Sequence, residues 1–129
     1  MITATALLAT VGHIHAFTRA RRFACWLGLT PSERSSAQRR RLGAISKMGD
    51  VYLRCLLTPG ARAVLLAAHR AEAKRRTLTR LQQWALAVQA RRGHNKATVA
   101  IANKLARFVW AVWSRETDHA DRPALPAAA

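Results

Sequence analysis

The chain has 129 residues, half of them hydrophobic, and a formal net charge of +16. This length suits one domain with a modest core, and no apolar run reaches the ~18 residues typical of a transmembrane helix. Residues 1–114 carry twenty basic and three acidic side chains, a net charge of +17. Such charge favours a polyanionic partner. We expect nucleic acid and no membrane, because the bases are not confined to one face of one helix.

The hydrophobic pattern predicts an all-α fold, with a compact multi-helix domain over 1–115 and a disordered tail over 116–129. No internal repeat and no strand-like alternation stands out. The first two predicted helices are 3–11, which ends at Gly12, and 17–27, which ends at Gly28. A third is predicted over 50–76, with Asp50 as its N-cap and an interruption at Pro59-Gly60. A fourth runs from Thr77 or Thr79 to Gly93, and a last helix is capped by Asn95.

Apolar residues at helical spacing predict the core. They are Leu27, Leu53, Leu56, Trp84, Leu105 and Trp110. Cys25 and Cys55 lie thirty residues apart in apolar surroundings, which predicts two reduced core thiols in a cytosolic protein. His13 and His15 lack the paired ligands typical of zinc sites, so we predict no metal site.

The segment 31–49, PSERSSAQRRRLGAISKMG, is the most unusual stretch; we call it the serine-arginine segment. Thr30 to Glu33 fits a capping box and predicts that a helical turn opens it. Five bases follow within fourteen residues, and guanidinium groups pair well with phosphate oxygens. Gly43 and Gly49 permit a close backbone approach. We interpret the segment as a phosphate-binding loop in preference to a merely solvated one.

The two serines of this segment raise the question of a nucleophile. A serine that attacks phosphorus needs cations to stabilise the developing charge and a base to take its proton. The arginines supply the cations, and Glu33 is the one carboxylate close in sequence. The residues alone therefore favour a segment that binds phosphate without a catalytic serine.

Several motifs in a fixed order resemble a known family. They are TALLATVG, ARRFACWLGLTP, RLGAISKMGDVYLRCLL and VAIANKLARFVWAV, spread over about 2–113. Together they resemble the C-terminal transposase domain of the bacterial insertion-sequence transposases of family one-one-zero. That resemblance implies a partner RuvC-like domain with four acidic residues, a guide RNA, DNA as substrate, and multimers in the bacterial cytoplasm. It also implies that this chain is an N-terminally truncated fragment, which we expect to be inactive alone.

The resemblance assigns roles to individual residues. The family's nucleophilic serine lies five residues after the proline of its GLTP-like motif, which is Ser36 here, and it would form a transient phosphoserine link to DNA. Ala37 departs from the family, which has glycine there. Magnesium is implied only for the RuvC-like domain, and no cofactor for this chain. The predicted nucleic-acid contacts are Arg39, Arg40, Arg41, Ser46, Lys47, Arg54, Lys96 and Lys104.

Two other functions compete with a serine-type transposase domain. A noncatalytic nucleic-acid-binding module would keep the basic surface and lose the reaction. A small RNA-binding protein of ribosomal type would need the high charge alone, and the ordered motifs would then be coincidence. The transposase domain requires a reactive Ser36 and an acidic partner domain, whereas the noncatalytic module requires neither.

Overall fold

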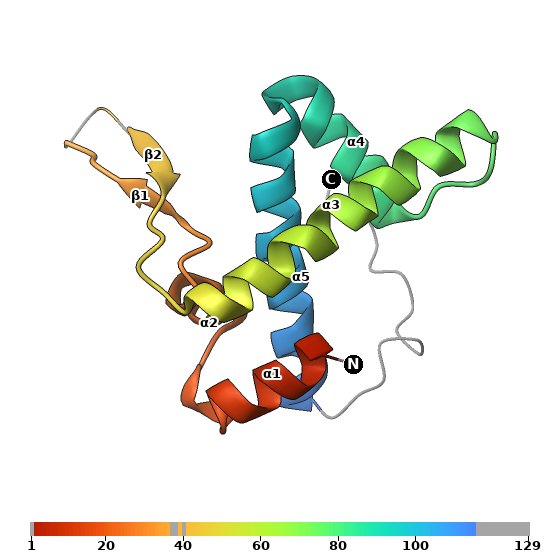
Figure 1. Ribbon diagram of the computed structural model, residues 1–129. Coiled ribbons are helices and arrows are strands. Elements are labelled where there is room, and N and C mark those ends of the chain that lie inside the picture. Colours follow the sequence, from red (N-terminus) through yellow and green to blue (C-terminus); the bar gives the residue numbers. More distant parts are fainter. Residues whose placement is uncertain (1, 37–38, 40, 116–129) are drawn as a thin grey trace.

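The computed structural model describes residues 2–36, 39 and 41–115, and it confirms the mostly helical class. The predicted tail, 116–129, lies outside the described residues. The described residues form five α-helices, one short 3₁₀ turn and a small antiparallel hairpin that extends away from the helices (Figure 1). In chain order the elements are α1 Ile2–Val11, the 3₁₀ turn η1 Ile14–Ala16, α2 Ala20–Trp26, β1 Pro31–Glu33, β2 Leu42–Ile45, α3 Val51–Ala73, α4 Arg80–Arg92 and α5 His94–Arg115.

Most helix ends lie where local chemistry places them. The Asp50 carboxylate accepts from the Leu53 amide at 2.7 Å, and Thr79 forms a reciprocal capping box with Gln82. At the end of α2 the Gly28 amide donates to Cys25 and the Leu29 amide to Ala24, which is a Schellman motif. These predicted caps are therefore confirmed.

The start of α5 differs from the prediction. Asn95 was expected to cap it, but the helix already includes His94, directly after Gly93. The Gly93 carbonyl accepts from the Ala97 amide at 3.1 Å, and Gly93 also ends α4 with a φ of 84°. One glycine thus separates two helices, because its positive φ reverses the chain direction without a loop.

The predicted interruption of α3 at Pro59-Gly60 is wrong, since the helix runs unbroken through both residues. Proline removes one backbone hydrogen bond and crowds the preceding turn, which disfavours a helix interior. Here Leu57 and Ala61 on either side of it are buried in the core. Tertiary packing on both flanks therefore holds the helix together where local propensity alone would end it.

The core forms where α5 packs against α2, α3 and α4, with α3 crossing α5 (Figure 1). Leu27 and Leu53 are fully buried, as predicted. Seven alanines are also buried, which lets helix backbones approach closely. They are Ala24, Ala61, Ala68, Ala85, Ala97, Ala102 and Ala106. Among the described helices α3 alone is long and apolar enough to cross a membrane, and five of its residues are buried in this core.

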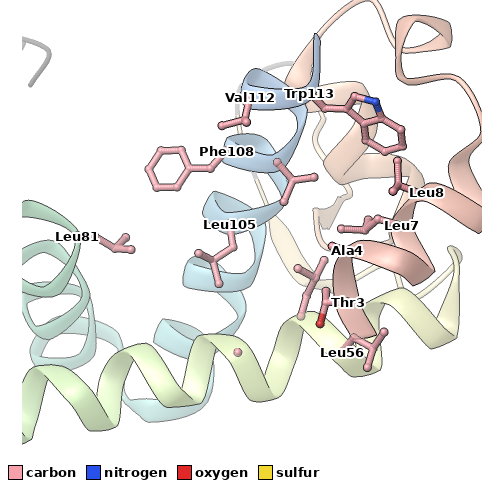
Figure 2. Close-up of a pocket in the computed structure, with 13 residues that line it drawn as sticks. Thr3, Ala4, Leu7, Leu8, Leu56, Leu81, Leu105, Phe108, Val112 and Trp113 are labelled. Carbon is pink, nitrogen blue, oxygen red and sulfur yellow. The ribbon is translucent and has the colours of Figure 1, made fainter. Parts of the chain in front are cut away.

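The other four predicted core residues are half-buried, and three of them, Trp84, Leu105 and Trp110, pack against the core from outside it. Leu56 and Leu105 line an apolar cavity of about 580 Å³ between α1, α3, α4 and α5. Figure 2 shows their side chains together with those of Leu7 and Leu8 of α1, which also line the cavity. The core therefore does not close fully around these two leucines.

The prediction that both cysteines are core thiols is wrong: Cys25 and Cys55 are free and exposed. Each lies two residues from a buried neighbour on either side, Phe23 and Leu27 for Cys25 and Leu53 and Leu57 for Cys55. Two residues correspond to about 200° of helical rotation, so the cysteines point away from the core.

The predicted helical turn at Thr30 to Glu33 is also wrong, because Pro31–Glu33 is a strand paired with Leu42–Ile45. The Ser32 hydroxyl donates across the pair to the Ala44 carbonyl at 3.2 Å instead of capping a helix. Proline's fixed φ suits an extended start as well as a helical one. Cross-strand bonds, which sequence alone does not reveal, decide between the two.

Glycine and arginine close the base of this hairpin. Gly28 has a φ of 72°, and a Cβ at Gly49 would overlap the backbone carbonyl oxygen of Trp26. The Arg54 guanidinium donates to the Leu27 carbonyl at 3.2 Å from α3. The chain entering the hairpin and the chain leaving it are thus in backbone contact.

We expect Gly49→Ala to lower the free energy of unfolding by about 1–3 kcal/mol, because the added methyl must displace backbone rather than a flexible side chain. Gly60→Ala is the matched control: a Cβ there meets no atom within 4 Å, and alanine is the better helix former. Urea denaturation measures both. Equal effects of the two substitutions would contradict the close approach at Gly49.

Candidate nucleic-acid interface

The hairpin projects from the helical body as an arm, with its described turn end farthest from the helices (Figure 1). Every described residue from Pro31 to Leu42 is exposed. The Arg34 amide donates to the Arg41 carbonyl at 2.9 Å, and Ser36 pairs with Arg39 through an amide-to-carbonyl bond of the same length. Strand pairing therefore extends toward the turn and holds Ser36 beside an arginine.

The two adjacent serines have different surroundings. The Ser35 hydroxyl donates to the Glu33 carboxylate at 2.7 Å, which is the expected reach of residues two apart on one side of a strand. Ser36 lies one residue further along the chain, in an isolated bridge with Arg39. The carboxylate nearest in sequence is therefore hydrogen-bonded to Ser35, the neighbour of the predicted nucleophile.

The predicted contacts of the serine-arginine segment fall into two groups. Arg39 and Arg41 are exposed on the arm, whereas Arg40 and Ala37 lie outside the described residues. Ser46 and Lys47 lie at the base: their amides donate to the Thr30 and Gly28 carbonyls at 2.9 and 3.3 Å. Lys47 has a φ of 55°, which places its side chain on a tight backbone turn.

Arg54 has a structural partner. Its guanidinium holds the Leu27 carbonyl at the hairpin base and would contact nucleic acid only with its remaining donors. This structural contact is sufficient to explain an arginine at this position of α3, even if Arg54 binds no ligand. Its role in nucleic-acid binding stays a prediction.

Lys96 and Lys104 line a second surface, a groove of about 1600 Å³ between the hairpin and α5; we call it the α5 groove. Sequence reasoning missed two further cations there, Arg107 and Arg115. The signal was present in the spacing: Lys96 and Arg107 are eleven residues apart, as are Lys104 and Arg115. Eleven residues make about three helical turns, so each pair lies in one row along α5.

Lys104 lies over an aromatic ring within this groove. Its Nζ is 4.0 Å from the centre of the Trp84 ring, a cation–π contact between α5 and α4. Partial burial, and secondarily the charge of Arg107, lower the pKa of Lys104. All four charged residues that line the groove in the described part of the chain are cations. Its electrostatic character therefore favours an anion.

The described residues offer no candidate metal centre, since no group of three or more His, Cys, Asp or Glu side chains comes together within 2–36, 39 and 41–115. The arrangement can therefore supply phosphate-binding cations and an exposed hydroxyl. It does not bring together a set of acidic ligands in that part of the chain.

The amino-acid sequence is similar to those of known transposases. Residues 1–78 match the transposase family described as IS116/IS110/IS902. A "Probable family 20 transposase" of Pseudomonas aeruginosa is 47% identical over 117 residues, which cover 90% of this chain and 32% of that protein. The transposase for insertion sequence element IS1111A of Coxiella burnetii is 42% identical over 115 residues, covering 89% and 30%. The chain thus spans about a third of these relatives' length, and no solved structure matches it.

Proposed function

Because the chain belongs to the IS116/IS110/IS902 family of transposases, we propose that it is the DNA-binding, serine-bearing part of a serine-type transposase. Family membership supports a role in DNA transposition. The observation that carries the finer proposal is the exposed Ser36 on a projecting arm, paired with Arg39. Breaking and joining DNA is proposed for the longer protein, of which this chain would be one part.

In the proposed reaction the Ser36 oxygen attacks a DNA phosphorus atom. A serine–phosphate ester bond forms as the bond from phosphorus to one deoxyribose oxygen breaks, and that oxygen leaves as a hydroxyl after protonation. Arg39 and Arg41 on the same arm would stabilise the charge on the phosphoryl oxygens. The Ser36 proton must pass to a base, and the nearby Glu33 already accepts a hydrogen bond from Ser35.

We propose that this base and any magnesium belong to the RuvC-like domain that the family resemblance implies. The described residues of this chain do not gather acidic ligands for a metal. By the same resemblance we propose DNA and a guide RNA as partners, a multimeric assembly, and the bacterial cytoplasm as location. We expect the isolated chain to bind DNA without reacting.

A noncatalytic nucleic-acid-binding module is the second candidate. The position of Glu33 favours it, because this nearby carboxylate accepts a hydrogen bond from Ser35, the neighbour of the proposed nucleophile. The two candidates share the binding surface and differ only in the reaction at Ser36.

DNA binding through phosphate contacts predicts a steep dependence on salt. We expect the affinity for duplex DNA to fall by orders of magnitude between ~50 and ~200 mM salt if several phosphates are neutralised. Replacing Arg39, Arg40 and Arg41 together with alanine should reduce the slope of log K against log salt by about 0.9 for each phosphate that the variant no longer neutralises. Fluorescence anisotropy of a labelled duplex measures it.

The matched control removes three exposed arginines elsewhere, Arg62 and Arg70 of α3 and Arg91 of α4. It changes the net charge equally and should leave the slope closer to that of the unaltered chain. An equal reduction of the salt slope in both variants would show that binding depends on the overall net charge and not on the arginines of the arm. A flat salt titration would contradict the proposed DNA binding itself.

A further inference from the structure

The α5 groove joins two kinds of surface that a nucleic acid can use. Along one wall run the cations of α5, with Lys96 and Arg107 about 16 Å apart along the helix axis at the usual rise per residue. Among the described residues no acidic side chain lines the groove. A chain of phosphates can therefore follow α5 without meeting a like charge.

Apart from Asn95 and Asn103, the lining between and opposite these cations is apolar and aromatic. Trp84 and Phe108 contribute rings, and Leu42, which is 54% exposed, comes from the hairpin wall. A duplex presents phosphates outward and keeps its bases stacked, so it would use the cations and leave this apolar lining in water. A single strand offers phosphates and base faces together, and single-strand sites combine basic grooves with aromatic platforms.

Hydrogen bonds to the rest of the helical body fix the α5 wall of the groove. The Asn103 amide donates to the Leu29 carbonyl at 3.1 Å, and the Trp110 indole donates to the Phe17 carbonyl at 2.9 Å. These bonds tie α5 to the segments before and after α2. The α5 wall therefore needs little rearrangement to accept a strand, which reduces the entropic cost of binding.

At the Trp84 ring, a nucleic-acid base could replace the Lys104 ammonium group. Its ammonium group now covers the ring face at 4.0 Å, partly out of water. A phosphate in the groove would attract this ammonium, and the ring face would then be free to stack on a base.

We propose that the α5 groove binds a single strand of DNA, with its phosphates along the α5 cations and its bases against the aromatic lining. This inference rests on the proposed function, because it names the state of the DNA that this domain takes. It adds a second binding surface to the arginine-bearing arm, which we propose for duplex DNA.

The test compares a labelled oligo(dT) of about 15 nucleotides with a duplex of the same length, by anisotropy at fixed salt. The variant Lys96→Ala/Arg107→Ala removes one row of cations and spares the Lys104 contact with Trp84. The variant Arg62→Ala/Arg70→Ala makes the same charge change on α3. We expect the groove variant to weaken oligo(dT) binding at least about tenfold relative to that control, with equal effects of the two on the duplex.

Tryptophan fluorescence supplies a second measurement that does not depend on charge. We expect oligo(dT) to quench it and the quenching to decrease in Trp84→Phe, which keeps an aromatic ring in the core-facing position. Unchanged quenching in that variant would overturn stacking at Trp84.

The remaining outcomes separate this inference from the proposed function. If the duplex binds and oligo(dT) does not, or if groove and control variants weaken oligo(dT) equally, the groove proposal is overturned and duplex binding by the arm stands. If neither nucleic acid binds, both are overturned. Tighter binding of an oligo(rU) of equal length would overturn DNA as the occupant.

Discussion

Ser36→Ala is expected to abolish the covalent protein–DNA adduct that we propose for this chain when a RuvC-like domain, magnesium and a matching guide RNA are supplied in trans. The substitution removes the oxygen that would bond to phosphorus, and no other group can take over that bond without the same placement on the arm. A denaturing gel of labelled DNA detects the adduct as a band of reduced mobility.

Ser35→Ala is the natural control, since it removes the neighbouring hydroxyl. The substitution breaks the 2.7 Å hydrogen bond to Glu33 and should reduce the adduct without abolishing it. An adduct that survives Ser36→Ala and disappears with Ser35→Ala would show that the nucleophile is Ser35. The isolated chain should form none, and if none forms under any complementation the noncatalytic module becomes the better interpretation.

Phe23→Ala should lower the free energy of unfolding by about 3–5 kcal/mol, the largest stability effect we expect from one core substitution. The Phe23 side chain is fully buried. Its ring centre lies 5.2 Å from that of Phe17 in an edge-on arrangement and 6.2 Å from that of Trp26. Removing it leaves a cavity where α2 meets α5, and urea denaturation with an unchanged m value would measure the destabilisation.

Trp84→Ala is the informative comparison for this substitution. The sequence predicted a buried Trp84, for which truncation would cost about as much as at Phe23. In the structure Trp84 is half-buried, with Lys104 over its ring, so we expect a smaller destabilisation. A cost at Trp84 equal to or above that at Phe23 would contradict the observed burial.

Local chemistry accounts for what could be predicted about the fold. Asp50, Thr79 and the glycines at 28 and 93 act on backbone groups within a few residues of themselves, so their effects can be read along the chain. The helical class follows from such signals together with the apolar periodicity. Membership of a transposase family was likewise recognisable from the order of the motifs.

Contacts between distant segments decided the rest. Thr30 to Glu33 had the residues of a helix start, yet pairing with Leu42–Ile45 made it a strand. Pro59 had the residue type of a helix break, yet the buried residues on both sides kept α3 continuous. Each case sets a local preference of a few kcal/mol at most against several long-range contacts, and the long-range contacts prevailed.

For the candidate site too, some features follow from the sequence and others only from the tertiary structure. The sequence by itself determined which cations and hydroxyls the chain carries and, through helical spacing, that α5 holds its cations in rows. Only the tertiary structure decided that the hairpin lies across from those rows and that Lys104 covers Trp84. The tertiary structure also brings the Arg54 guanidinium within hydrogen-bond distance of the Leu27 carbonyl. The physical reason is that a groove has two walls, here separated by about fifty residues or more, and no local propensity relates one wall to the other.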